Sequence, residues 1–346
     1  MIYLDWAATS IPSIYVSDYA YNWFNPNSHY AVDEVKAFSE CEQSVKEAIG
    51  AKSGKVIFGG NTSWFFEKLY CNQANFWFCS PYEHDCIYKN GVEMDYKEIE
   101  CLTDEIYCHQ FVNNITGEIF DVGKIGSHIK EKSGYFVCDA TAAIGKAFIP
   151  QMPNIDQWCD ALVLSSHKIR VDNKQIGCAW ISDEFYDYLY LSGTVLNGYN
   201  WCDGTPDLAC AKATTKAIEV NCNNLEYYNQ SYNYLVWELA SRLNDNNIRY
   251  KGVAANNRTG AINAITLKGI NADVLCRYLA DRDIYISPGH SACEENSDYR
   301  VLKEYGLTQE ECESTIRVSF GPRTTKNDIY GLVDGIVRFK EEYCNG

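Results

Sequence analysis

The sequence predicts an α/β fold, with a mostly parallel sheet flanked by helices and a smaller α+β domain toward the C-terminus. Short apolar runs typical of buried strands alternate with segments of helical period, which favours a parallel sheet covered on both faces. Later in the chain the alternating pieces become shorter. A chain of 346 residues also favours two domains of unequal size. We expect a large domain at residues 12–235 and a small one at residues 1–11 plus 236–346.

The first predicted elements are a helix, a strand and a second helix. The stretch Asp33 to Ile49 has the apolar spacing of an amphipathic helix and ends at Gly50. Its apolar positions are Val35, Phe38, Val45, Ala48 and Ile49. KVIFGG, from Lys55, is a short buried strand, and NTSWFFEKLY begins with good capping residues. A strand, a glycine turn and a helix start can hold a phosphate, with Thr62 adding a hydroxyl, although an ordinary βα turn has the same pattern.

Further strands are predicted at NFWFCS, EIYCHQFV, YFVCD, ALVLSS and CAWIS, with helical segments such as Val122 to Glu131 between them. The stretch from Asp207 to about Asn244 has helical character with a break near NCNN. The shorter alternating pieces of the small α+β domain are Gly260 to Leu267, Val274 to Leu279, Ile284 to Ile286 and Ile316 to Phe320.

Composition excludes several classes of protein. The net charge of −16 argues against nucleic-acid binding through a basic surface and against an acidic partner. The sixteen cysteines are scattered without a CxxC pair, so we expect most to be buried and reduced. The sequence contains no run of about 18 uncharged apolar residues, so we expect no membrane-spanning helix. The N-terminus lacks the features of a signal peptide, and we expect a cytoplasmic protein.

Two polar residues mark a candidate site at the carboxyl ends of the predicted strands. Asp139 ends YFVCD, and Lys168 follows DALVLSSH. Ligands of open α/β sheets bind at these strand ends. A lysine and an acid placed there suggest pyridoxal phosphate, which needs a lysine for its aldehyde and an acid for its pyridine nitrogen.

The motifs also resemble a known family. From YLDWAATS at residue 3 to STIRVSFGPRTT near residue 325, they follow in order the pattern of cysteine desulfurases in the class V aminotransferase superfamily. These are fold type I pyridoxal phosphate enzymes. The resemblance implies a seven-stranded sheet in the large domain, pyridoxal 5'-phosphate as cofactor, and a homodimer with composite active sites.

The resemblance assigns three residues to the cofactor ring. Lys168 matches the lysine that forms the Schiff base, a role open to an amine whose pKa its surroundings lower. Asp139 matches the acid that keeps the pyridine nitrogen protonated. His84, in PYEHDCIY, matches the catalytic histidine that stacks on the ring and assists proton transfer.

Other matching residues are assigned to the cofactor phosphate and the substrate. The phosphate group is matched by Asn61, Thr62, Ser165, Ser166, His167 and, reaching the partner subunit's cofactor, Thr205. Asn114 matches the asparagine beside the cofactor and the substrate. For its neighbour Asn113, a structural role in a turn is an equally good interpretation. Arg317 matches the arginine that takes the substrate carboxylate, a task suited to its planar fork.

Cys293, in the polar segment PGHSACEENSDY, matches the catalytic cysteine. The implied activity converts L-cysteine to L-alanine, with sulfur captured as a persulfide on Cys293 and passed to an acceptor protein. Ala142 and Cys202 stand where the family usually has glutamine and arginine. Alternatives are another class V enzyme, such as a selenocysteine lyase or an aminotransferase, and a non-catalytic paralogue that serves as a binding subunit.

Overall fold

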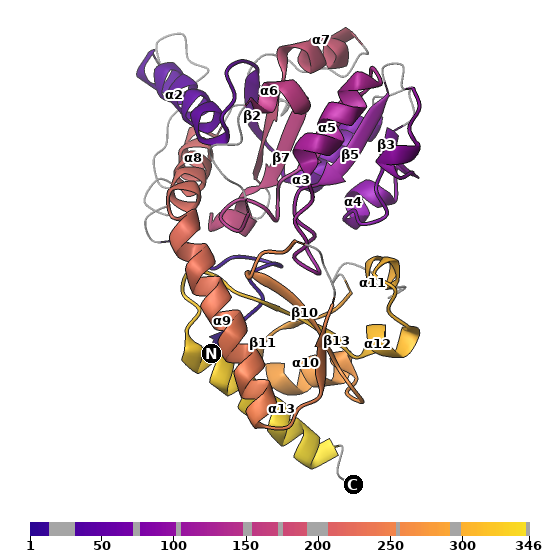
Figure 1. Ribbon diagram of the computed structural model, residues 1–346. Helices are drawn as coiled ribbons and strands as arrows, with labels where there is room; N and C mark the ends of the chain where they lie inside the picture. Colours follow the sequence, from indigo (N-terminus) through magenta and orange to yellow (C-terminus); the bar gives the residue numbers. More distant parts are fainter. Residues whose placement is uncertain are drawn as a thin grey trace. The chain divides into compact units, whose positions relative to one another are not determined.

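The computed structural model describes residues 1–13, 32–71, 77–101, 105–147, 154–171, 176–191, 207–253, 257–290 and 299–343. The chain divides into a large unit, residues 11–111 and 120–225, and a small unit, residues 1–10, 112–119 and 226–346 (Figure 1). The small unit thus includes the short segment Val112–Ile119, which lies far from its other parts in the sequence.

A seven-stranded sheet forms the centre of the large unit and has helices packed around it (Figure 1). Its strands are β2 (Lys55–Gly59), β3 (Trp77–Cys79), β4 (Val92–Glu93), β5 (Ile106–Gln110), β6 (Tyr135–Asp139), β7 (Ala161–Ser165) and β8 (Gly177–Ile181). The spatial order is β2-β8-β7-β6-β5-β3-β4. Among the described strands of this sheet, β8 runs opposite to the other six. The predicted α/β fold with a mostly parallel sheet is confirmed.

The register of this sheet brings several strand ends to one edge. Gly59 of β2 and Ser165 of β7 both pair with Gly177 of β8, and Gln110 of β5 pairs with Asp139 of β6. Since β8 is antiparallel to β2 and β7, the carboxyl ends of β2 and β7 point the same way as those of β5 and β6. Polar residues that follow these strands therefore gather at one edge of the sheet.

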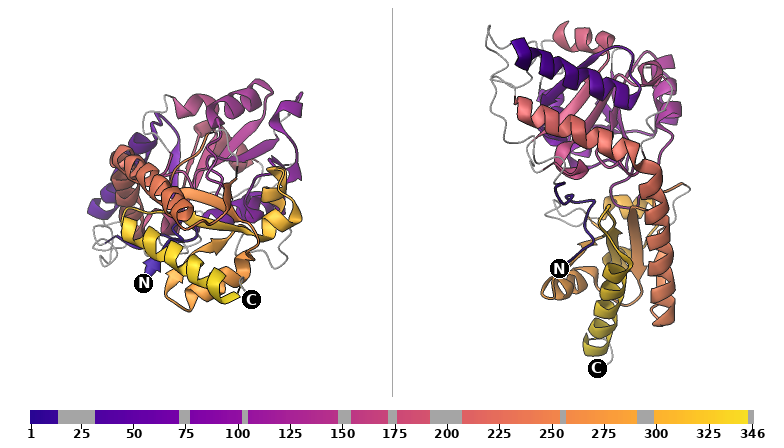
Figure 2. Two further views of the ribbon diagram at one scale, coloured as in Figure 1. Left: turned by 60° about the horizontal axis from the view of Figure 1, so that its bottom comes forward. Right: turned by 90° about the vertical axis from the view of Figure 1, so that its left-hand side faces the viewer.

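The helices of the large unit are α2 (Val32–Ile49), α3 (Thr62–Cys71), α4 (Asp85–Tyr88), α5 (Val122–Glu131), α6 (Ile155–Trp158), α7 (Asp183–Leu191) and α8 (Leu208–Asn223), with the 3₁₀ turns η1 (Tyr96–Glu98) and η2 (Ser166–Ile169). Helices α2, α3, α5 and α8 follow predicted helical segments, whereas the other helices of this unit were not predicted. Helices α2 and α8 pack side by side (Figure 2). On α2 the buried face is Phe38, Cys41, Val45 and Ile49, whereas Val35, counted above among its apolar positions, is 39% exposed.

The small unit contains a four-stranded antiparallel sheet in the order β12-β13-β10-β9 and a pair of parallel strands, β1 and β11 (Figures 1 and 2). Its strands are β1 (Ile2–Tyr3), β9 (Tyr250–Gly252), β10 (Ile262–Leu267), β11 (Ile284–Tyr285), β12 (Ser287–Pro288) and β13 (Thr315–Ser319). Its helices are α9 (Leu225–Asp245), α10 (Ala272–Ala280), α11 (Arg300–Glu304), α12 (Gln309–Glu313) and α13 (Lys326–Tyr343). The piece Val274 to Leu279 belongs to helix α10.

The division of the chain differs in detail from the expected domains. Residue 235, the expected end of the large domain, lies inside α9, whereas the large unit ends at Leu225. The break predicted near NCNN falls at Asn224, which caps α8 just before α9 begins.

Two general features of the described residues bear on function. No helix in the described part of the chain is long and apolar enough to cross a membrane. Twelve cysteines whose side chains the structure describes form no disulfide, and eight of them are buried.

Candidate active site

Three hydroxyl groups meet at the carboxyl edge of the large sheet. The Thr62 hydroxyl lies 2.7 Å from that of Thr141 and 2.8 Å from that of Ser165. The Thr62 backbone N–H donates to Ser165 Oγ at 3.0 Å. We call these three residues, all buried, the hydroxyl cluster. Because the cluster includes the first residue of α3, donors and a helix N-terminus occur together, which is an arrangement that favours a phosphate.

Close packing of the backbone accompanies the hydroxyl cluster. A Cβ added at Gly177 would lie 2.5 Å from the Gly60 oxygen and 2.6 Å from the Leu164 oxygen. Asn61 caps α3, since its Oδ1 accepts a hydrogen bond from Trp64 N at 3.0 Å. The side-chain oxygen of Asn61 therefore stabilises the helix start, and its predicted contact with a phosphate stays a prediction.

Asp139 is a buried carboxyl at the end of β6. Its Oδ1 accepts a hydrogen bond from Thr141 N at 2.8 Å. Burial raises the pKa of Asp139, while hydrogen bonds from Thr141 and the charge of Lys168 act in the opposite direction. A buried acid of this kind gains from a positively charged partner.

Lys168 lies on the 3₁₀ turn η2, directly after β7. The turn is anchored by Ser166, whose N–H donates to Ile176 O at 3.0 Å and whose hydroxyl lies 2.9 Å from that of Thr214 in α8. Arg170 ends the turn in the left-handed region at φ 81°. Ser166 therefore faces α8 and holds the turn, while His167 and Lys168 are half-buried.

His84 is the N-cap residue of α4, where its Nδ1 accepts a hydrogen bond from Cys86 N at 3.3 Å. Burial, and after it the charge of Asp139, raises the pKa of the Cys86 thiol to about 12, while the charge of Lys168 acts in the opposite direction. The start of α4 therefore lies within electrostatic range of both residues. In the large unit, the structure places His84 near the same strand ends as Asp139 and Lys168.

In the small unit, the structure brings Asn114 and Arg317 together. Arg317 is 4% exposed and donates from Nη1 to Asn114 O at 3.1 Å. Its Nη2 donates to Asp5 Oδ1 at 3.0 Å and to Ser287 Oγ at 3.1 Å. Its Nε is buried without a hydrogen-bond partner among the described residues. Asp5 thus supplies the negative charge that a buried arginine requires, and the role in substrate binding stays a prediction.

Asn113 is the turn residue of its pair. Its Oδ1 accepts hydrogen bonds from Ile115 N and Thr116 N, both at 2.9 Å. This turn places the neighbouring Asn114, which is 8% exposed, against Arg317.

Three residues discussed above lie outside the described ranges. They are Cys293, Thr205 and Cys202.

A model of a known protein family matches a large part of the chain. The model described as "Aminotransferase class-V" matches residues 98–332, which include Asn114, Asp139, Lys168 and Arg317. The chain belongs to the class-V aminotransferases. Membership of this enzyme family confirms the expectation that the protein is an enzyme.

Individual proteins similar to this chain include cysteine desulfurases. The chain is 26% identical to a cysteine desulfurase, IscS, from Clostridium botulinum, over 95% of this chain and 91% of that protein. Among solved structures, it resembles a NifS-like protein from Rickettsia africae, with a TM-score of 0.81, 19% identity and coverage of 99% of both chains. It also resembles a cysteine desulfurase from Thermococcus onnurineus, with a TM-score of 0.75 and 19% identity over 99% and 95% of the two chains. The predicted resemblance to cysteine desulfurases is confirmed, and the structural likenesses establish a shared fold.

Two residues near the candidate site were not predicted from the sequence. Thr141 joins the hydroxyl cluster and binds Asp139. Lys146 is buried, and its pKa falls to about 8 through burial and the charge of Lys168. Thr141 could have been found, because an aspartate side chain often accepts a hydrogen bond from the backbone N–H two residues later and so forms a turn.

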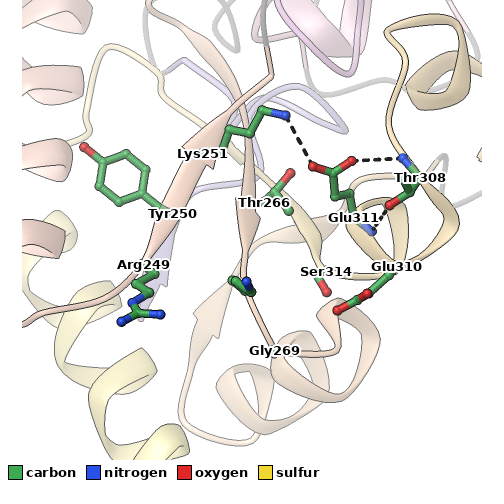
Figure 3. A pocket seen from close by; sticks show the side chains of 10 residues that line it. Arg249, Tyr250, Lys251, Thr266, Gly269, Thr308, Glu310, Glu311 and Ser314 are labelled. Carbon is green, nitrogen blue, oxygen red and sulfur yellow. Dashed lines mark hydrogen bonds and ion pairs between the residues drawn. The ribbon is translucent and has the colours of Figure 1, made fainter.

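The small unit also contains a surface cavity of about 440 Å³ (Figure 3). Lys251 and Glu311 point toward each other across it and form an ion pair at 3.3 Å, while Glu311 also accepts a hydrogen bond from Thr308 N at 3.0 Å. None of the predicted site residues lines this cavity, so cavity size alone does not locate the class-V site. Within the described ranges, no three His, Cys, Asp or Glu side chains are placed to hold a metal ion.

Proposed function

We propose that the protein is a pyridoxal phosphate-dependent cysteine desulfurase, which converts L-cysteine to L-alanine and captures the sulfur on Cys293. The observation that supports this most strongly is the gathering of Asp139, Lys168 and the hydroxyl cluster at one edge of the sheet. It occurs in a class-V chain whose curated relatives include proteins named cysteine desulfurases.

The residues at this edge fit pyridoxal phosphate. The hydroxyl cluster and the N-terminus of α3 would hold the phosphate. Asp139, whose ionised form is disfavoured by burial, would gain a positively charged partner in the protonated pyridine nitrogen. Lys168 follows the next strand and would bind the aldehyde. His84 would lie against the ring.

Pyridoxal phosphate, when bound, draws electron density from the α-carbon of an amino acid. The chain's own residues would then divide the work. Arg317 would bind the substrate carboxylate through hydrogen bonds from its guanidinium, with Asn114 beside it. The Lys168 amine, which lies at the end of β7 beside the proposed ring site, would take the α-proton.

Cys293 would act as the nucleophile. Its thiolate would attack the substrate sulfur, so that a sulfur–sulfur bond forms as the carbon–sulfur bond breaks. The electron pair of the broken bond stays with the β-carbon of the substrate, which takes up a proton. The substrate fragment then leaves as L-alanine. Cys293 retains the sulfur as a persulfide for transfer to an acceptor protein. Thr205 would contact the cofactor of a second copy, which makes the active form a homodimer.

The proposal is tested by cysteine variants assayed with L-cysteine and pyridoxal phosphate. We expect Cys293→Ser to lose at least 100-fold in sulfide formation while it still binds the cofactor, as followed by cofactor absorbance. Cys101→Ser is the matched control, because Cys101 is an exposed thiol outside the site, and it should retain wild-type rates. A Cys293→Ser variant that forms sulfide at the wild-type rate would contradict the proposed nucleophile and favour a selenocysteine lyase. A wild-type protein that binds the cofactor but forms no sulfide would favour an aminotransferase.

A further inference from the structure

The imidazole of His84 is held on one side by two groups of Cys86. The backbone N of Cys86 donates to Nδ1 at 3.3 Å, and the Cys86 sulfur lies 3.2 Å from the same nitrogen. A backbone N–H can only donate a hydrogen bond, so Nδ1 accepts and has no hydrogen of its own. The neutral ring therefore has its hydrogen on Nε2.

The thiol of Cys86 is suited to be the second donor. Burial raises its pKa to about 12, so the sulfur keeps its hydrogen at neutral pH. Since Nδ1 offers only a lone pair, a hydrogen bond between the two groups requires the S–H to point toward Nδ1, while the Ser63 side chain also interacts with the sulfur. Protonation of His84 would place a hydrogen on Nδ1, remove the hydrogen bond from Cys86 N, and leave the sulfur only as a weak acceptor. The contacts therefore favour the neutral ring over the charged one.

The turn that precedes His84 is held firmly in place. Glu83 is fully buried, and its Oε1 accepts hydrogen bonds from Ser80 Oγ at 2.6 Å and from Gln110 N at 2.8 Å. The Gln110 side-chain amide donates to Tyr82 O. These bonds tie the segment Ser80–His84 to the end of β5. The His84 backbone, at φ −63° and ψ 148°, has the extended geometry that an N-cap requires.

We propose that Cys86 is a positioning residue which, together with the N-cap of α4, holds His84 as the neutral tautomer with its hydrogen on Nε2. In this form His84 offers a hydrogen-bond donor at Nε2 and does not act there as a base. The inference rests on the proposed function in one respect, that His84 contacts the cofactor. It assigns removal of the α-proton to Lys168 and leaves His84 to orient groups through its N–H.

The tautomer can be measured directly on the cofactor-free protein. Long-range ¹H–¹⁵N correlation spectra of protein labelled with ¹⁵N-histidine distinguish protonated from unprotonated ring nitrogens. The chain has 6 histidines, and the His84 signals are those that disappear in His84→Gln. We expect a protonated Nε2 and an unprotonated Nδ1. A protonated Nδ1 in the wild-type protein would overturn the proposal, whatever the protein does with L-cysteine.

Two replacements test the part played by Cys86. Cys86→Ala removes the thiol donor, and we expect the ratio of the two tautomers to shift about 2- to 10-fold toward Nδ1–H, the effect of one neutral hydrogen bond. Cys86→Ser keeps a donor and should restore the wild-type ratio. Cys101→Ser again serves as the control. An unchanged ratio in Cys86→Ala would show that Cys86 does not position the ring.

Turnover gives a second readout. The Cys86→Ala variant should lower kcat for L-cysteine by a similar factor with little change in KM, and Cys86→Ser should recover it. A change confined to KM would contradict a role in orienting His84. The spectra need neither cofactor nor substrate. They therefore decide the tautomer of His84 even if the protein proves not to be a desulfurase.

Discussion

Gly177 lies in β8 between the ends of β2 and β7, and its replacement by alanine tests the packing around the hydroxyl cluster. An added Cβ would lie 2.5 Å from the Gly60 oxygen, 2.6 Å from the Leu164 oxygen and 3.1 Å from Asn61 Cα. All three atoms belong to the backbone, so a flexible side chain cannot relieve the clash. The strands on either side must move apart. Overpacking of this kind costs about 1–3 kcal/mol.

The same movement would separate groups that the cofactor phosphate needs. Thr62 follows β2, Ser165 ends β7, and their hydroxyls now lie 2.8 Å apart. We expect Gly177→Ala to lower the free energy of unfolding by about 1–3 kcal/mol in urea denaturation. We also expect it to weaken pyridoxal phosphate binding about tenfold or more, measured by absorbance titration, since tenfold corresponds to about 1.4 kcal/mol.

Gly123 provides the matched control. It lies in α5, and the nearest atom to an added Cβ is Asp121 Oδ1 at 3.8 Å, which is an ordinary contact. Gly123→Ala should leave cofactor affinity unchanged and raise stability by about 0.5–1 kcal/mol, because glycine is unfavourable within a helix. If Gly177→Ala matched the wild type in both measurements, close strand approach would not be required at this edge. Our account of the phosphate site would then be refuted.

Three further predictions follow. Burial raises the pKa of Asp139 and so disfavours its charged form in the folded protein. Asp139→Asn should therefore raise the free energy of unfolding of the cofactor-free protein above that pKa, while it lowers the affinity for pyridoxal phosphate. A variant less stable than the wild type in urea denaturation would contradict this. Burial lowers the pKa of His109 to about 4 from 6.5, so stability should fall by up to about 3 kcal/mol as pH drops through this interval. His109→Gln should flatten that slope in denaturation curves, and an unchanged slope would count against it. Arg317→Lys should raise KM for L-cysteine about 10- to 100-fold through loss of the planar fork, whereas an unaltered KM would remove Arg317 from the substrate site.

Local patterns in the sequence were sufficient to predict much of the large unit. The apolar period of Val122 to Glu131 matches α5 residue for residue, because an exposed face and a buried face alternate regularly there. Asp139 and Lys168 were placed at strand ends for a similar reason, since buried strands form short continuous apolar runs. The gathering of these ends at one edge then follows from the parallel topology.

Contacts between segments that are distant in the sequence could not be predicted from such local patterns. No local signal shows that Val112–Ile119 belongs with the small unit, or that Asp5 pairs with Arg317, because these arise from the way remote strands associate. A buried arginine requires an anion, and Asp5 supplies it from a part of the chain that is remote in the sequence. The thiol contact of Cys86 with His84 likewise depends on the geometry of a single helical cap.

We propose above that this protein removes sulfur from L-cysteine. Its most direct test is to incubate the purified protein with pyridoxal phosphate, L-cysteine and a reductant, and to follow alanine and sulfide together. Our account predicts that both appear in equal amounts. A protein that binds pyridoxal phosphate through Lys168 yet produces neither alanine nor sulfide would contradict it.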